Sequence, residues 1–404
     1  MFMSEPINIA ALRERARARL PRPLFEFVDG GAEDEVTLNA NRESFRELRV
    51  LPRLFTDVSE IDLSATIAGR QLTVPILFSP AGLVGVVHPA GETAPAIVAR
   101  RHGTLAIVSG HGTYSLEEVA QIQPSPGWFN IFPWGERDRY GAMIDRARSA
   151  GFTGLCLTVD TTVAGNRERD IRNGWTAPPR LGSHLHEYAI HPRWVVNLMR
   201  HRRCTLRNFA PQPPPLRSFA RRASHAAAST IDLISRSFSW EDLEWIRAQW
   251  EGPLALKGAF SVRDAIRAAE CGIDVLLVGN HGGRQLDGLP SGLEQLALLR
   301  DALQGRVDLI LDGGVRRGLD IVKAICIGAS AVSIGRAWVY GLAAGGVSGV
   351  EQALTILERE LRTVMALLGA RSIRELDASF LLGAGLQLEP HSRRPLQASR
   401  CDSP

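Results

Sequence analysis

Eight short apolar runs, separated by stretches of helical character, constrain the fold of this chain more than any other feature. Each run is almost wholly apolar instead of alternating with polar residues, which is typical of parallel strands covered on both faces. Repeated strand and helix units predict a parallel sheet, and eight of them predict a closed (β/α)8 TIM barrel. The expected strands are Val74–Ser79, Leu105–Ser109, Trp128–Phe132, Gly154–Asp160, Leu254–Lys257, Val275–Gly279, Leu309–Asp312 and Ala331–Gly335.

Several segments between these runs have the apolar spacing of amphipathic helices. They are Ser115–Gln121, Tyr140–Ala150, Ser261–Cys271, Gly292–Leu303 and Gly318–Gly328. Polar residues gather where the predicted strands end, and catalytic groups of TIM barrels lie at those carboxyl ends. We therefore expect the functional site there, formed by residues that include Ser109, Asn130, Asp160, Lys257, His281, Asp312 and Arg336.

Two segments lie outside the repeat of strands and helices. We expect one domain over residues 1–385, with an N-terminal helical cap over 1–70 and a flexible tail over 386–404. Residues 163–238 form an insertion between the fourth and fifth strands that is too long for an ordinary connection in a barrel.

The insertion is basic. From Tyr188 to Ile231 it has no acidic residue. A basic, partly amphipathic segment can lie on an anionic membrane surface, and residues 193–222 are the candidate for such peripheral contact. A solvated loop or a contact between subunits is the alternative. The positive charge of the segment from Tyr188 to Ile231 comes from Arg193, Arg200, Arg202, Arg203, Arg207, Arg217, Arg221 and Arg222.

The bulk composition excludes several classes of protein. A net charge of +4 is too small to indicate a nucleic-acid partner. Five scattered cysteines without a CxxC pair indicate free thiols in a reducing compartment rather than disulfides. No His, Asp or Glu spacing on one predicted element matches a metal site, so no metal is expected. Without a signal-peptide pattern or an apolar run of about 18 residues, the chain is expected in the cytoplasm, with peripheral contact to the inner face of the membrane as an option.

The octapeptide Asn280–Asp287 places a histidine, two glycines and an arginine directly after a predicted strand. The guanidinium of Arg284 can hold a carboxylate through two hydrogen bonds, and the imidazole of His281 can take a proton near neutral pH. This pair suits a substrate whose acidic C–H or O–H lies next to a carboxylate.

A phosphate site is expected after the seventh and eighth strands. Asp312-Gly313-Gly314 and Arg316 follow one strand, and Gly335-Arg336 ends the other. Glycines let backbone N–H groups approach an anion, and a following helix N-terminus favours negative charge. Barrels often bind a cofactor phosphate at this place.

With these segments in this order, the chain resembles the FMN-dependent 2-hydroxy acid oxidases and dehydrogenases, a family that includes glycolate oxidase, flavin-type L-lactate dehydrogenase and mandelate dehydrogenase. The resemblance covers roughly residues 15–380. It rests on Gly31-Ala32-Glu33-Asp34, Ser79-Pro80-Ala81-Gly82, Leu157-Thr158-Val159-Asp160, Leu256-Lys257-Gly258, Asn280–Asp287 and Asp312-Gly313-Gly314.

The resemblance implies a role for each of these residues. His281 would be the base that removes the hydroxyl proton or the α-hydrogen, and Asp160 would stabilise the imidazolium. Arg284 and Arg167 would hold the substrate carboxylate, and Lys257 would stabilise negative charge on the reduced flavin. The implied FMN contacts are Ala81, Gly82, Ser109, Asn130, Thr158 and Lys257 at the ring system, Asp312 at the ribityl chain, and Gly314, Arg316, Gly335 and Arg336 at the phosphate.

The chain departs from the family pattern in the substrate pocket. Phe27 and Phe132 stand where the family usually has tyrosines, so two directed hydrogen bonds, each worth about 1 kcal/mol or more, are lost. His111 replaces a bulky aromatic residue of the glycolate enzymes, and Gly82 replaces an alanine. The changes favour a larger or aromatic side chain over glycolate or lactate.

Three interpretations follow from the intact base and arginines together with the missing phenols. The first is FMN-dependent oxidation of an L-2-hydroxy acid with a bulky or aromatic side chain, with a quinone or oxygen as acceptor. The second is a tailoring oxidase acting on a modified amino acid or biosynthetic intermediate. The third is an FMN-binding paralogue without activity. By resemblance the chain is expected to form a homo-oligomer, such as a tetramer.

Overall fold

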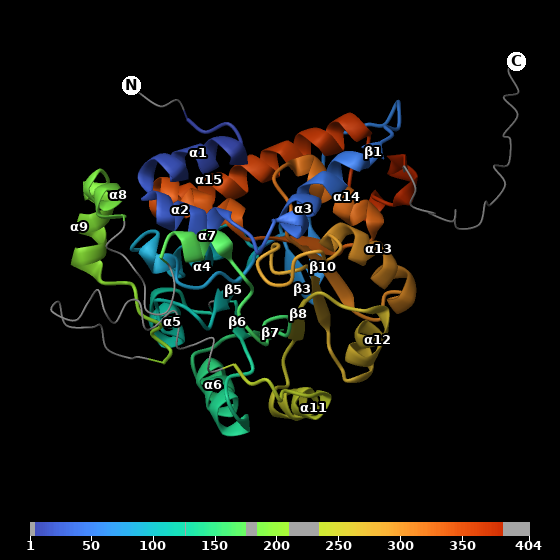
Figure 1. The fold of residues 1–404 in the computed structure, drawn as a ribbon. Helices are drawn as coiled ribbons and strands as arrows, with labels where there is room; N and C mark the ends of the chain where they lie inside the picture. The colour runs from blue at the N-terminus through green and yellow to red at the C-terminus, as the bar shows by residue number, and fades with distance from the viewer. Residues whose placement is uncertain (1–4, 126, 175–183, 210–233, 383–404) are drawn as a thin grey trace, which may run out of the picture.

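The computed structural model describes residues 5–125, 127–174, 184–209 and 234–382, and its centre is a closed barrel of eight parallel strands (Figure 1). The strands follow one another around the barrel in chain order, with β11 pairing with β4 to close it. All eight predicted strands are therefore confirmed. Their bounds are β4 (Ile76–Phe78), β5 (Leu105–Ser109), β6 (Trp128–Ile131), β7 (Gly154–Thr158), β8 (Leu254–Gly258), β9 (Val275–Val278), β10 (Asp308–Asp312) and β11 (Ala331–Ile334).

Helices surround the barrel, and the predicted ones are present with ends shifted by at most three residues. Capping boxes mark the first turns of α5 and α13. The hydroxyls of Ser115 and Ser291 each accept a hydrogen bond from the backbone N–H of a glutamate three residues later. The side chain of that glutamate accepts a hydrogen bond from the backbone N–H of the serine. The outer helices are α4 (Thr93–Arg101), α5 (Leu116–Ile122), α6 (Arg137–Ser149), α11 (Trp240–Gln249), α12 (Val262–Glu270), α13 (Gly292–Leu303), α14 (Gly318–Ile327) and α15 (Arg336–Leu368).

The barrel interior is a packed apolar core and is closed at one end. Side chains from all eight strands form this core, and each is at most 2% exposed. The hairpin of β2 (Ala65–Ile67) and β3 (Arg70–Leu72) adds Ile67 and Leu72 to the same cluster. The hairpin therefore covers the amino end of the barrel, and the carboxyl end remains for the site. The strand residues of the core are Leu77, Leu105, Ile107, Trp128, Cys156, Ala255, Val275, Leu277, Ile310 and Ala331.

The N-terminal segment forms three helices that pack against other helices around the barrel: α1 (Ile9–Arg19), α2 (Arg22–Asp29) and α3 (Val36–Glu47). In Figure 1 they lie beside α14 and α15. Arg13 donates two hydrogen bonds of 2.7 Å to Asp29, and the Tyr340 hydroxyl donates a third of 2.6 Å to the same carboxylate. This network joins α1, α2 and α15 above the barrel. Short elements complete the described chain: β1 (Arg49–Val50), η1 (Val84–Val86), η4 (Ile373–Glu375), η5 (Ala378–Phe380) and β12 (Leu381–Leu382).

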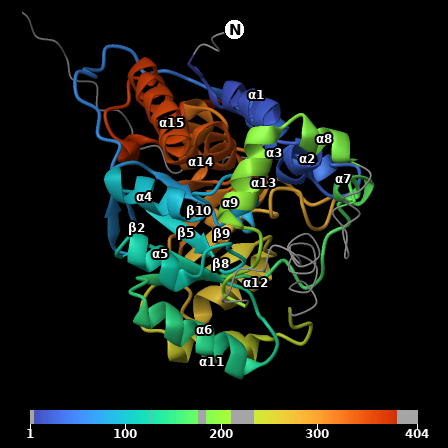
Figure 2. The same cartoon turned by 90° about the vertical axis from the view of Figure 1, so that its left-hand side faces the viewer.

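The insertion contributes α7 (Glu168–Arg172), α8 (Leu185–Ala189) and α9 (Pro192–His201), of which α8 and α9 lie at the outside of the molecule (Figure 2). Arg203 and Arg207 do not face solvent as free charges, since both pair with Glu118, at 2.9 and 3.3 Å. They fasten residues 203–209 to the start of α5. Residues 210–222 of the predicted membrane segment, together with the tail at 386–404, lie outside the described residues. In the part of the chain that the structure describes, no helix is long and apolar enough to cross a membrane.

Candidate active site

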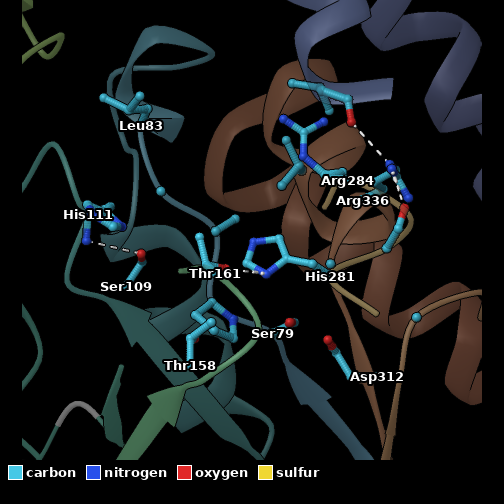
Figure 3. Close-up of a pocket in the computed structure, with 18 of the residues that line it drawn as sticks. Ser79, Leu83, Ser109, His111, Thr158, Thr161, His281, Arg284, Asp312 and Arg336 are labelled. Atoms are coloured by element: carbon cyan, nitrogen blue, oxygen red, sulfur yellow. Dashed lines mark hydrogen bonds between the residues drawn. The ribbon is translucent and has the colours of Figure 1, made fainter. Parts of the chain in front are cut away.

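A cavity of about 750 Å³ opens at the carboxyl end of the barrel. Residues from every strand end, from α2 and from the insertion line it. Figure 3 shows part of this lining, with Ser109, His281 and Asp312 among the labelled residues. All predicted site residues except Asp160 line this cavity, and Asp160 lies behind His281, to which it is hydrogen-bonded. The structure thus brings together the residues that the sequence analysis selected: Phe27, Ala81, Gly82, Ser109, His111, Asn130, Phe132, Thr158, Arg167, Lys257, His281, Arg284, Asp312, Gly314, Arg316, Gly335 and Arg336.

His281 follows β9 in a left-handed backbone conformation, with a φ of 56°. Gly282 and Gly283 continue it with φ of 68° and 73°. A side chain at Gly283 would lie 2.5 Å from the backbone nitrogen of Leu38, so only glycine fits there. The His-Gly-Gly sequence therefore forms a tight turn against α3, and a strained backbone at a functional position is common.

A hydrogen bond of 3.1 Å joins His281 Nδ1 to Asp160 Oδ1. The Thr161 hydroxyl donates to the same carboxylate oxygen at 3.1 Å. Burial lowers the pKa of His281 below its ordinary value, although Asp160 opposes the shift. Burial alone would raise the pKa of Asp160, but the His281 and Lys257 charges hold it below its ordinary value. The imidazole is therefore neutral at pH 7, with a carboxylate placed to stabilise it once it gains a proton.

Arg284 and Arg167 form the cationic wall of the cavity. Arg284 donates to the carbonyl oxygens of Phe27 and Gly30 at 2.6 and 3.0 Å, at the end of α2. Burial and the neighbouring Arg167 lower the pKa of Arg284 to about 9, so it stays cationic at neutral pH. Arg167 Nη2 is held by Gln285 Oε1 at 2.9 Å. Two positive groups beside one cavity suit a carboxylate ligand.

The floor of the cavity carries two pairs of polar side chains at the strand ends. Lys257 Nζ lies 2.7 Å from Asp312 Oδ2. Burial would lower the pKa of Lys257, but the Asp312 and Asp160 carboxylates together raise it above its ordinary value. Asn130 Nδ2 donates to Thr158 Oγ1 at 2.8 Å and to the Cys156 carbonyl at 2.9 Å. Lys257 is thus a buried cation held in place by Asp312.

The ends of β10 and β11 form the predicted phosphate region. Gly313 and Gly314 have φ of 120° and 77°, and a side chain at Gly313 would meet no atom within 4 Å, so this backbone is open. The helix α15 begins at Arg336, next to Gly335. Arg336 donates to the carbonyls of Gly282 and Gly30 at 2.8 and 2.9 Å. Open backbone, a helix N-terminus and arginines form a suitable anion site.

The opposite side of the cavity is apolar and aromatic. The ring centroids of His111 and Phe132 lie 4.2 Å apart, and Phe27 lies 5.2 Å under the Arg284 guanidinium. A side chain at Gly82 would lie 2.8 Å from Cβ of His111. The space expected at Gly82 is therefore taken by His111 itself rather than left for a substrate.

Sequence reasoning missed several residues of the site. Thr161 and Gln285 adjoin residues that were selected and fix their orientation. Asp287, within the octapeptide, caps α3 by accepting from the Val36 and Thr37 amides. Leu206 and Ile234 come from the insertion and line the cavity, although nothing in their local sequence indicates it.

These features define a (β/α)8 protein with a cofactor-sized cavity, a histidine hydrogen-bonded to a carboxylate and a region suited to an anion. The FMN-dependent dehydrogenase family matches residues 16–382 of the chain. An L-lactate oxidase of Nostoc sp. is 38% identical over 94% of this chain and 99% of its own length. A peroxisomal (S)-2-hydroxyacid oxidase of Arabidopsis thaliana is 36% identical over 93% and 96% of the two chains.

The solved structure of the monotopic membrane protein (S)-mandelate dehydrogenase is similar as well. It superposes with a TM-score of 0.88 at 34% identity, covering 94% of this chain and 100% of that one. The chain belongs to the FMN-dependent dehydrogenase family, is an oxidoreductase and uses FMN.

The cavity fits FMN on its own chemistry. A phosphate would find open backbone at Gly313 together with Arg316 and Arg336. The Ser333 hydroxyl is buried on the cavity wall and has no hydrogen-bond partner among the described residues, so it can serve a polar group of the cofactor. Lys257 supplies a cation beside the ring system that the resemblance places there.

Proposed function

We propose that this protein oxidises an L-2-hydroxy acid with a bulky or aromatic side chain to the corresponding 2-oxo acid. The observation that carries the proposal is the partly buried His281–Asp160 pair, whose histidine lines one cavity together with Arg167 and Arg284. A neutral imidazole backed by a carboxylate, next to two guanidinium groups, matches a substrate with a proton to lose beside a carboxylate. L-lactate oxidase and (S)-mandelate dehydrogenase among the relatives support this class of substrate.

Each residue has a separate task in the proposed reaction. Arg167 and Arg284 bind the substrate carboxylate and so orient the hydroxyl-bearing carbon. His281 accepts the proton that the hydroxy acid loses, and Asp160 stabilises the resulting imidazolium across their 3.1 Å hydrogen bond. FMN, when bound, would supply the acceptor for the two electrons and for the second hydrogen that the substrate loses. Lys257, buried and cationic, would stabilise the negative charge that these electrons bring to the flavin.

The apolar wall supports the larger side chain. Phe27 and Phe132 present rings without hydroxyls, and Leu206 and Ile234 extend the wall from the insertion. Burying a phenyl group there is more favourable than burying a methyl group by about 1–3 kcal/mol.

Steady-state turnover with an artificial electron acceptor tests this preference. We expect kcat/KM for L-mandelate to exceed that for L-lactate by about tenfold or more. Ile234→Ala, which shortens the wall, should lower the rate with mandelate more than the rate with lactate. A preference for lactate in the wild-type protein would refute the proposed side chain, and detection of the 2-oxo acid identifies the product.

We also propose that α8 and α9 contact an anionic membrane surface. Ile190, directly after α8, and Val196 on α9 are 68% and 61% exposed, and the basic Arg193 and Arg200 are exposed on α9. A membrane face would explain exposed apolar side chains beside arginines. The acceptor would then be a quinone, with oxygen as the alternative.

Flotation with anionic vesicles tests this contact. Val196→Asp should reduce binding several-fold, because it places a charge on the apolar face. Leu298→Asp on α13 is the matched control, since Leu298 is also exposed, at 62%, and lies far from the insertion in sequence. Equal vesicle binding by both variants would refute the membrane contact.

A further inference from the structure

His111 has an unusual hydrogen bond for a residue that faces a substrate cavity. Trp134 Nε1 lies 3.2 Å from His111 Nε2, and Trp134 itself is only 2% exposed. An indole N–H can only donate, so His111 Nε2 must be the unprotonated acceptor. In the neutral ring the proton then resides on Nδ1. Trp134 therefore fixes the tautomer of His111.

The protonated Nδ1 is available to a ligand. Among the described residues Nδ1 makes no hydrogen bond. It is also not a fully buried atom, because the buried side-chain atoms without a partner do not include it. Nδ1 is therefore open to solvent. Because His111 lines the cavity, the Nδ1–H is accessible from it. The structure thus presents a neutral donor in a wall that is otherwise mostly apolar.

The loop that carries His111 is held on both sides. The His111 carbonyl accepts from the Leu83 amide at 3.0 Å, an approach that only a glycine at position 82 permits. Glu92, 2% exposed, accepts from the Thr113 amide and hydroxyl at 2.9 and 2.8 Å. The imidazole is therefore preorganised and cannot swing away at little cost.

The position of His111 matches the substrate side chain rather than the carboxylate. Figure 3 shows His281 between His111 on one side and Arg284 and Arg336 on the other. Burial, together with the nearby His281 and Arg167, lowers the pKa of His111 to about 3, so it stays neutral in the working range. A neutral donor recognises a neutral acceptor without demanding a counter-charge.

We propose that His111 selects, through its Nδ1–H, an aromatic 2-hydroxy acid whose ring carries an oxygen acceptor, and that Trp134 is the positioning residue that fixes this donor. The inference rests on the proposed function and names its substrate more closely. It also gives the pocket a directed hydrogen bond that Phe27 and Phe132 cannot supply.

Binding of redox-inert acids to the FMN-loaded protein tests the inference without turnover. Methoxyphenylacetates and ethylphenylacetates, substituted at the ortho, meta or para position, match in size and differ by one ring-bound oxygen. Their dissociation constants can be read from the perturbation of flavin absorbance. In the wild-type protein at least one methoxy isomer should bind about 3- to 10-fold more tightly than its ethyl counterpart.

The variants separate recognition from a general loss of binding, because each ratio is taken within one protein. His111→Phe keeps a ring and removes the donor, so the ratio should fall to about one. Trp134→Phe lets the imidazole proton move to Nε2, so this variant should also lower the ratio. A wild-type ratio near one at all three positions, a ratio that persists in His111→Phe, or no binding by any of the six acids would overturn the inference. Retention of the full ratio in Trp134→Phe would overturn the role of Trp134. Since these acids have no hydroxyl to oxidise, a failure of the proposed oxidation would show separately, as an FMN that no 2-hydroxy acid reduces.

Discussion

At the scale of single residues, the proposed catalysis depends on a base that is neutral at working pH. Burial disfavours the imidazolium of His281, so its pKa lies below the ordinary value of 6.5, and Asp160 limits that shift. Because only the neutral ring can take a proton, kcat/KM should decline as pH falls through this lowered pKa. Above it kcat/KM should be level until Arg284, with a pKa of about 9, begins to lose the charge that binds the substrate carboxylate. The acidic limb of the profile therefore lies below pH 6.5.

Asp160→Asn tests the sign of this coupling. Removing the carboxylate takes away the group that raises the pKa of His281, so the acidic limb should move to lower pH. The plateau should also fall, by about 10²-fold or more, since the imidazolium loses its partner. A pH–rate profile of the wild-type and variant proteins gives both quantities. A limb that moves to higher pH in the variant would contradict the electrostatic assignment.

At the scale of elements, the turn after β9 holds the base against the N-terminal helices. Gly283→Ala should lower the free energy of unfolding by about 2 kcal/mol or more, because φ is 73° and the new methyl group meets the Leu38 backbone at 2.5 Å. Gly288→Ala is the matched control: φ is 83° there, but no atom lies within 4 Å, so only the backbone penalty of about 1 kcal/mol applies. Denaturant unfolding of both variants measures the difference. Equal losses would mean that the contact with α3 contributes nothing.

At the scale of the whole molecule, much of the fold could be predicted because parallel strands are buried on both faces. That burial leaves continuous apolar runs, so all eight strands were predicted, and the polar residues at their ends marked the cavity. Local sequence could not show that Leu206 and Ile234 reach the cavity or that Trp134 meets His111, since these contacts exist only after the chain folds.

Charge patterns were a weaker guide than apolar patterns. Arg203 and Arg207 counted toward a basic surface in the sequence, yet both pair with Glu118 on α5, a residue remote in the chain. The left-handed backbone of His281 was equally hidden, because such a conformation is imposed by the surrounding turn rather than by the residue itself.

Anaerobic mixing of the FMN-loaded protein with L-mandelate, with flavin absorbance recorded over time, shows directly whether His281 serves the oxidation. Wild-type protein should bleach, and His281→Gln should bleach about 10²- to 10⁴-fold more slowly while it retains FMN. His102→Gln is the control, because His102 pairs with Glu351 at 3.0 Å and lies outside the cavity lining, so its rate should match wild type. Flavin that no aromatic L-2-hydroxy acid bleaches, or equal rates in His281→Gln and wild type, would contradict the assignment of His281 as the base of a 2-hydroxy acid oxidation.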